Sequence, residues 1–183
     1  MRYEASNHIK RIVLDTEFTT LQQDAQLISL ALVADSGEKF YAVFDDFDEK
    51  ALSPFVEKNV LPYLNIQNDK TLTGNTQQIR SAITDWLDAL EQQDSKFEFW
   101  ADVPHYDWVL FCELFGGSLN LPKNIHFMCL DIATLLMANG IDHQTERIKL
   151  IDQAEIKDKY QIHNALSDAE IGMTLLKKLL KYP

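Results

Sequence analysis

Three short apolar segments follow one another near the start of the sequence. They are RIVLD at 11–15, LISLALVA at 27–34 and KFYAVF at 39–44, and they are rich in β-branched and aromatic residues. Segments of this length and composition predict β-strands. Because Ser36 and Gly37 form a turn signal between the last two segments, we expect the three strands to lie antiparallel in a meander.

The remaining sequence alternates helical patterns with two further apolar segments. Residues 97–101 and 126–130 predict a fourth and a fifth strand. Hydrophobic residues at helical spacing predict helices over 51–60, 77–93, 107–115, 132–138 and 164–182. Asp131 is expected to cap one of them. The polar residues 141–162 are expected to form an ordered loop, with a short helix within it as the alternative. This order predicts an α/β fold with a mixed five-stranded sheet, in a single domain over residues 1–183.

The composition limits the classes of protein to which the chain can belong. No apolar run reaches the roughly 20 residues of a membrane-spanning helix, and the first residues lack the apolar stretch of a signal peptide. We therefore expect a cytoplasmic protein that does not associate with membranes. Cys112 and Cys129 lie in apolar segments without the spacing of a zinc site. Reduced core cysteines are expected, and a disulfide is the alternative.

The net charge of −11 argues against a general affinity for long nucleic acid duplexes, because such binding depends on many Lys and Arg side chains. An acidic protein can still hold a few nucleotides if bound cations face the phosphates and basic residues gather locally. The basic residues in the last quarter of the chain are Arg147, Lys149, Lys157, Lys159, Lys177, Lys178 and Lys181. A solvated helical face is an equally good interpretation of them.

Asp15 and Glu17 stand at the end of the first predicted strand, in the sequence LDTEF. Residues two apart on a strand project from the same face, so the two carboxylates converge. Like charges held this close require a cation. The alternative is an acidic strand end that faces water. However, the preceding apolar strand carries both acids to an edge of the sheet, where α/β proteins often bind ligands.

Two more positions add candidate polar groups. Asp107 stands at the start of a predicted helix, where it is either a ligand or a favourable charge in the first turn. Asp168 falls one turn into the last helix, and His163 precedes that helix. A rigidly placed acid beside a mobile imidazole suits a metal ligand next to a general base, because histidine exchanges protons near neutral pH. Taken singly, such residues are common on protein surfaces.

In combination, the motifs LDTEF, YD and HNALSD resemble those of the DEDDh family of 3′-5′ exonucleases, which has a ribonuclease H-like fold. The segments LISLALVADSGEKFYAV, NVLPYL and CELFG make the chain most similar to small bacterial exoribonucleases related to ribonuclease T and first recognised in mycobacteria. The similarity runs from Arg11 to the last helix and is weakest over 141–160. Many DEDDh members have His-Asn where this chain has Asp102 and Val103, which leaves a nucleotide contact from that segment open.

This resemblance implies a set of roles. Two Mg²⁺ or Mn²⁺ ions would be bound by Asp15, Glu17, Asp107 and Asp168. His163 would take a proton from the attacking water, and Phe18 would pack against the terminal base or sugar. The implied substrate is single-stranded RNA or a 3′ overhang, with DNA also possible, and the implied products are nucleoside 5′-monophosphates. The resemblance also implies helices on both faces of the sheet and a homodimer.

Two other functions are compatible with these residues. One is a ribonuclease H-like module that binds nucleotides or a partner protein without turnover. The other is a metal-dependent phosphohydrolase of small nucleotides. Intact residues at all five motif positions argue against the first function. A comparison of a mononucleotide ester with an oligonucleotide as substrates separates the second from an exonuclease.

Overall fold

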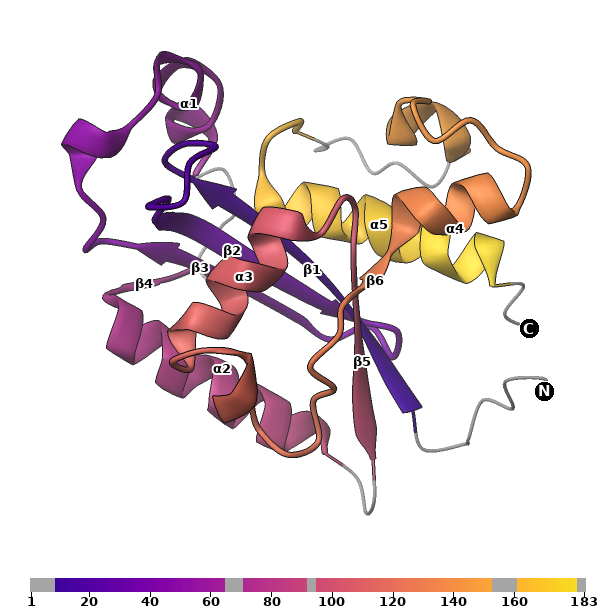
Figure 1. Cartoon of the computed structure of the whole chain (residues 1–183), viewed down its shortest axis with the longest axis horizontal. Coiled ribbons are helices and arrows are strands. Elements are labelled where there is room, and N and C mark those ends of the chain that lie inside the picture. The colour runs from indigo at the N-terminus through magenta and orange to yellow at the C-terminus, as the bar shows by residue number, and fades with distance from the viewer. Residues whose placement is uncertain (1–8, 65–70, 92–94, 153–160, 181–183) are drawn as a thin grey trace.

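The computed structural model describes residues 9–64, 71–91, 95–152 and 161–180, and a sheet of six strands lies at its centre (Figure 1). The strands are β1 (Ile9–Phe18), β2 (Leu27–Ala34), β3 (Lys39–Phe44), β4 (Leu72–Gly74), β5 (Lys96–Ala101) and β6 (Leu130–Asp131). Their order across the sheet is β4-β3-β2-β1-β5-β6. The first three strands pair antiparallel, as predicted, whereas β4 runs parallel to β3, β5 to β1 and β6 to β5. The sheet is therefore mixed.

The sheet has one strand more than predicted, and its last strand is shorter. The additional strand is β4, whose three residues pair with the end of β3 through the backbone; they are too few to show a hydrophobic pattern. The strand predicted over 126–130 is confined to β6. Before it, the backbone N–H of Met128 donates to Nδ1 of His126 at 3.1 Å. This local turn interrupts pairing along β5.

The described residues contain five α-helices and four short 3-10 helices. The α-helices are α1 (Pro54–Asn59), α2 (Thr76–Leu90), α3 (His105–Leu114), α4 (Ile132–Ala138) and α5 (Ala165–Leu179). The 3-10 helices are η1 (Glu49–Ala51), η2 (Leu61–Tyr63), η3 (Ser118–Asn120) and η4 (Arg147–Leu150). The helix predicted over 51–60 is divided, because Ser53 caps α1 and Pro54 occupies its first turn. In the loop predicted over 141–162, η4 is the short helix, and residues 153–160 lie outside the described residues.

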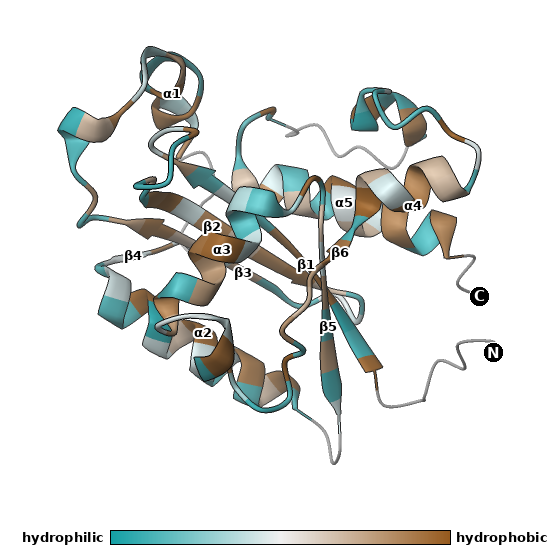
Figure 2. Cartoon of the chain, viewed as in Figure 1, coloured by the Kyte–Doolittle hydropathy of each residue, from teal (hydrophilic) through white to brown (hydrophobic). Residues whose placement is uncertain are grey.

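Helices cover both faces of the sheet, as the resemblance implied. On one face α2 and α3 pack against β1 and β2, and on the other α1, α4 and α5 do so (Figure 1). Hydrophobic residues concentrate along the central strands, and the first turn of α3 is hydrophilic (Figure 2). Every residue of β2 is buried. Along β1, Ile12 and Leu14 belong to the first layer and Val13 to the second, because successive side chains of a strand point to opposite faces.

Helix α5 approaches β1 closely at Gly172. A Cβ atom at this position would lie 2.9 Å from Cγ1 of Val13 and 3.3 Å from Cδ1 of Ile132. Glycine inside a helix costs about 1 kcal/mol relative to alanine, so close packing accounts for its presence. Asp168 lies one turn before Gly172 on α5, and Asp15 follows Val13 on the same face of β1. The contact therefore sets the register in which α5 carries Asp168 to the end of β1.

Several predictions about single residues can be compared with the structure. Asp131 caps α4 as predicted, its carboxylate accepting the N–H groups of Ala133 and Thr134, each at 3.0 Å. Cys112 and Cys129 are free thiols, so the disulfide alternative is wrong. Burial raises the pKa of Cys112 to about 11, which keeps this thiol protonated. Within the described ranges, no helix has the length and apolar character to cross a lipid bilayer.

Candidate active site

Strand β1 and helix α5 bring three carboxylates together at one end of the sheet. Asp15 and Glu17 lie near the end of β1, opposite Ala31 and Ser29 of β2, and face the side on which α5 packs. Asp168 lies in the first turn of α5. One oxygen from each of the three carboxylates lies within 4.8 Å of the other two. Residues about 150 positions apart in the sequence thus meet at one place, as the motifs predicted.

Asp107 lies beside this trio and is held by the backbone between its first two members. It stands in the first turn of α3 and is buried. Its Oδ1 accepts hydrogen bonds from the backbone N–H and the hydroxyl of Thr16, at 2.9 and 2.7 Å. Thr16 is the residue between Asp15 and Glu17, so α3 is fastened to β1 at the centre of the acidic motif. Asp107 is not among the three residues grouped within 4.8 Å.

The carboxylates repel one another in surroundings that are poor in water. Burial raises the pKa of Asp15 well above its ordinary value, and the charges of Asp107, Asp168 and Glu17 add to the effect. Burial, with Asp168 and Asp107, raises the pKa of Glu17 to about 8. Burial also raises the pKa of Asp107 to about 6, although the hydrogen bonds from Thr16 oppose the rise. At neutral pH the cluster therefore favours the uptake of a proton or a cation.

A divalent cation fits these ligands. Asp15, Glu17 and Asp168 offer carboxylate oxygens, which are the hard donors that Mg²⁺ and Mn²⁺ prefer. A bound cation would also remove the repulsion that raises the pKa of Asp15 and Glu17. The raised pKa values and the grouping of oxygens are thus two observations that point to the same ligand.

His163 stands at the edge of this cluster in an unusual backbone conformation. Its φ angle is 62°, in the left-handed region that residues other than glycine seldom adopt. Its backbone N–H donates to Oδ2 of Asp168 at 3.2 Å. Its ring meets the ring of Phe55 edge to face, with 5.1 Å between centroids and 85° between planes. The structure therefore places His163 against Asp168, as its motif predicted, and it also places Phe55 there, which no local pattern indicated.

Aromatic rings lie beside the acids as well. Phe18 follows Glu17 on β1 and stacks on Tyr106, with centroids 5.2 Å apart and planes 16° apart. Tyr106 directly precedes Asp107 on α3. Both rings are half-buried, so each keeps an accessible part. This arrangement is compatible with the predicted contact of Phe18 with a nucleotide, and that role stays a prediction.

In the part of the chain that the structure describes, three of the basic candidates near the C-terminus already have acceptor partners. Arg147 makes two hydrogen bonds to the carboxylate of Asp102, at 2.8 and 2.9 Å. Lys149 pairs with Glu146 at 2.7 Å, and Nζ of Lys178 donates to the carbonyl oxygen of Leu150 at 3.0 Å. Three further candidates lie outside the described residues, namely Lys157, Lys159 and Lys181. Asp102, one of the departures from the DEDDh pattern, thus has Arg147 as its partner.

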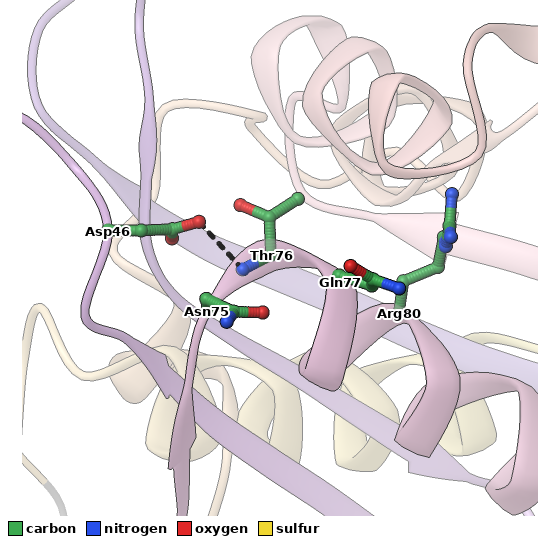
Figure 3. A pocket seen from close by; sticks show the side chains of 5 residues that line it. All are labelled: Asp46, Asn75, Thr76, Gln77 and Arg80. Carbon is green, nitrogen blue, oxygen red and sulfur yellow. Dashed lines mark hydrogen bonds between the residues drawn. The ribbon is translucent and has the colours of Figure 1, made fainter.

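A hollow of about 580 Å³ at the start of α2 includes none of the five predicted site residues. It is lined by Asp46, Asn75, Thr76, Gln77 and Arg80 (Figure 3). Helix N-termini often bind anions. Here, however, the N–H of Thr76 donates to Oδ2 of Asp46 at 2.8 Å (Figure 3). The N–H of Gln78 donates to Oδ1 of Asn75 at 3.0 Å. Protein oxygens therefore already occupy these two donors.

Comparison with known proteins assigns this geometry to a family. Residues 10–180 match the model of the 3′-5′ exoribonuclease Rv2179c-like domain. The chain belongs to this family. The 3′-5′ exoribonuclease Rv2179c of Mycobacterium tuberculosis strain H37Rv is 31% identical over 167 residues, which cover 88% of this chain and 98% of that protein. The narrower resemblance drawn from the sequence is thereby confirmed, and the matched range contains all five motif residues.

The Rv2179c-like domain shares its fold with DEDDh nucleases of known structure. The nuclease domain of 3′hExo, a DEDDh family member bound to rAMP, has a TM-score of 0.67 at 16% identity, covering 97% of this chain and 94% of that one. Pop2p of S. pombe, in a form with Mg²⁺ and Mn²⁺ bound, has a TM-score of 0.64 at 13% identity, covering 94% and 83%. These similarities confirm the predicted fold class.

Proposed function

We propose that this Rv2179c-like domain is a metal-dependent exoribonuclease that releases nucleoside 5′-monophosphates from single-stranded or overhanging 3′ ends. The observation that carries the proposal is the meeting of Asp15, Glu17 and Asp168 within 4.8 Å, beside Asp107 and His163. The family supplies the direction of cleavage and the preference for RNA. We further propose that residues 1–183 act as one exonuclease domain.

The four acids would hold two Mg²⁺ or Mn²⁺ ions. Such ions, when bound, lower the pKa of water and stabilise charge on the attacking and leaving oxygens. The protein's own part is to hold the ligands in place before substrate arrives. The hydrogen bonds from Thr16 fix one oxygen of Asp107, and the close contact at Gly172 fixes the height of Asp168 above β1. This preorganisation supports the assignment of all four acids to one site.

His163 would accept the proton of the attacking water. Its position supports this role, because the backbone is hydrogen-bonded to Asp168 while the half-buried ring touches Phe55. An imidazole beside metal ligands is a suitable proton acceptor for an attacking water. Replacement of His163 is therefore expected to lower turnover more than substrate affinity.

The aromatic rings on either side of the acids suggest how a 3′ end is held. Phe18 and Tyr106 stack near Glu17 and Asp107, and Phe55 lies against His163. Bases of every kind stack on such rings, so sequence preference is expected to be slight. Lys58 lies three residues after Phe55 on α1, where its charge would attract the phosphates of the strand that leads into the site.

A homodimer and a cytoplasmic location also belong to the proposal. The side chains of Val109, Phe127 and Met128 are more than half exposed, and Nε1 of Trp108 donates to the carbonyl oxygen of Phe127 at 2.8 Å, which joins α3 to the segment before β6. Adjoining exposed apolar side chains of this kind often belong to protein interfaces. Light scattering of the purified protein tests the dimer: the mass of one chain at micromolar concentration would contradict it.

The activity is tested with RNA labelled at its 5′ end, in the presence of Mn²⁺. We expect a ladder of products that shortens one nucleotide at a time from the 3′ end, and EDTA should stop the reaction. Asp168→Asn is expected to abolish the ladder. Asp85→Asn is the matched control, because it makes the same change of charge on the exposed face of α2.

Four outcomes would contradict the proposal. Internal cuts would exclude an exonuclease, and an unchanged rate for Asp168→Asn would exclude the assigned site. If the protein hydrolysed a mononucleotide ester and left the oligonucleotide intact, the phosphohydrolase alternative would be favoured. Binding of RNA without any product would favour the non-catalytic module. A DNA strand of the same sequence in a parallel reaction measures the preference for RNA.

A further inference from the structure

Directly after His163, a buried side chain joins three parts of the chain. Asn164 is 1% exposed. Its Nδ2 donates to the carbonyl oxygen of Tyr63 at 3.1 Å and to the hydroxyl of Tyr41 at 3.4 Å. Its Oδ1 accepts the N–H of Ser167 at 3.2 Å, which caps α5. Asn164 thereby links the start of α5 to η2 and β3.

Tyr41 completes this link. Its hydroxyl donates to the carbonyl oxygen of Leu64 at 3.1 Å. Burial raises the pKa of Tyr41, and the charge of Glu17 adds to the rise, so the phenol keeps the proton that this hydrogen bond requires. We call the hydrogen bonds from Asn164 and Tyr41 to each other, to Tyr63 and to Leu64 the Asn164 tie. Buried hydrogen bonds of this kind hold their groups in one arrangement.

The backbone of His163 needs such support. A φ of 62° is unfavourable for a residue with a Cβ atom. On the C-terminal side the peptide bond joins His163 to the immobilised Asn164, and its own N–H is bound to Asp168. If the tie were lost, the residue would be free to return to an ordinary negative φ. That change would move the imidazole relative to the carboxylates.

The same tie also holds the ring that touches His163. Helix α1 carries Phe55 and ends at Asn59, and η2 begins at Leu61. Because η2 is bound to Asn164 through the carbonyl oxygen of Tyr63, α1 stays beside the start of α5. The edge-to-face contact of Phe55 with His163 depends on that placement.

We propose that Asn164 and Tyr41 are positioning residues, which hold His163 in its left-handed conformation and thereby aim its imidazole at the attacking water. The inference rests on the proposed exonuclease function. It assigns Asn164 a purpose beyond capping a helix, since a cap alone requires the bond to Ser167 and not the bonds to Tyr63 and Tyr41.

Two variants break the tie from opposite sides. Asn164→Ser keeps a residue that caps helices well but removes the donor to Tyr63 and Tyr41. Tyr41→Phe keeps the packing of the ring and leaves α5 untouched. Asn75→Ser is the matched control, because Asn75 caps α2 through an equivalent bond of 3.0 Å to Gln78 and lies outside the site.

Turnover of RNA, its KM and the affinity for Mn²⁺ are measured for each variant. We expect both tie variants to lower kcat by about 10-fold to 100-fold, the loss typical of a misplaced catalytic group, while KM and Mn²⁺ affinity change less than about 2-fold. Asn75→Ser should match the wild type in all three. An equal loss in the control, or weaker Mn²⁺ binding, would overturn the proposal by pointing to general destabilisation or to Asp168 instead.

A double-mutant cycle with His163→Ala then tests whether the tie acts through His163. In that background, Asn164→Ser and Tyr41→Phe should leave the residual kcat unchanged, because there is no imidazole left to aim. A further loss of about 10-fold would overturn the proposal. Wild-type protein that does not degrade RNA at all would instead refute the proposed function, so the two failures are distinguishable.

Discussion

One strand, β1, serves two regions of different character. Its residues Ile12 and Leu14 are fully buried in the apolar layer between the sheet and α2 and α3. Immediately beyond them, Asp15 and Glu17 are half-buried acids with raised pKa values. The apolar layer stabilises the fold, whereas the acidic end destabilises it as long as no cation is bound. Stability and activity therefore depend on different residues of one strand.

Unusual backbone conformations also lie close to the acidic residues. Among the described residues, Val103 and His163 are the two non-glycine residues with positive φ, at 57° and 62°. Both lie close to the acids in sequence: Val103 is four residues before Asp107, and His163 is five before Asp168. Unfavourable conformations persist where surrounding contacts hold them, and they gather at functional sites. The apolar layer supplies the rigid frame that makes this possible.

The largest expected effect is the loss of activity from a single acid. Asp15→Asn keeps the shape of the side chain and removes one charge from the cluster. We expect hydrolysis of RNA to fall by at least about 1000-fold, because stabilisation of the transition state by bound metal is worth several kcal/mol. The ion-free variant should unfold at a higher temperature than the wild type, since buried repulsion is relieved. Activity assays test the expected loss of hydrolysis, and thermal unfolding in EDTA tests the expected gain in stability. An unfolding temperature below that of the wild type would contradict the contrast between the apolar layer and the acidic end of β1.

The second effect lies in the apolar layer and should leave the chemistry intact. Ile83 is fully buried on α2 against the sheet. Ile83→Ala is expected to lower the free energy of unfolding by about 2–5 kcal/mol, through lost burial and a residual cavity. At a temperature where the variant is folded, kcat per folded molecule should equal that of the wild type. Urea unfolding and single-turnover assays test this, and a large fall in kcat would show that the regions are coupled.

The parts of the acidic site that follow from local sequence patterns could be predicted. The apolar run ahead of Asp15 marks a strand, and the period of two then places Glu17 on the same face. Asn164 and Asp168 fit the start of a helix, and the lysines near its end fit the helix dipole. The order of the motifs, through the family resemblance, assigned Asp107 to the same site. These inferences need only neighbours in sequence or a family resemblance.

The rest depends on contacts across long gaps in the sequence. Asn164 and Tyr41 are 123 positions apart, and the partners Arg147 and Asp102 are 45 apart. No local pattern predicts which side chains meet when a sheet closes on a helix. The contact of Phe55 with His163 was missed for the same reason. The positive φ of His163 was also unforeseen, because glycine is the residue that most clearly signals that conformation in a sequence.

A third, smaller effect links the two regions through the register of α5. Gly172→Ala improves helix propensity but places a Cβ atom 2.9 Å from Cγ1 of Val13, which lies in a packed layer and cannot move freely. We expect a net loss of about 1–3 kcal/mol in the free energy of unfolding. Because Asp168 lies one turn away on α5, Mn²⁺ affinity should fall as well. Calorimetry of Mn²⁺ binding measures this; unchanged affinity would show that the register is set elsewhere.

The smallest expected effect concerns pH. Without metal, the pKa of Glu17 is about 8 in the folded protein and near the ordinary 4.5 when unfolded. Between these values the folded state binds more protons than the unfolded state, so stability is complete below the unfolded pKa and is lost as pH rises through the folded pKa. The wild type in EDTA should thus lose more of its unfolding temperature between pH 5 and pH 8 than Glu17→Gln does. Saturating Mg²⁺ should restore more of the unfolding temperature at pH 8 than at pH 6, because the cation replaces the proton. If both proteins showed the same pH dependence, Glu17 would belong with the stabilising region of β1 and the contrast between its two ends would be lost.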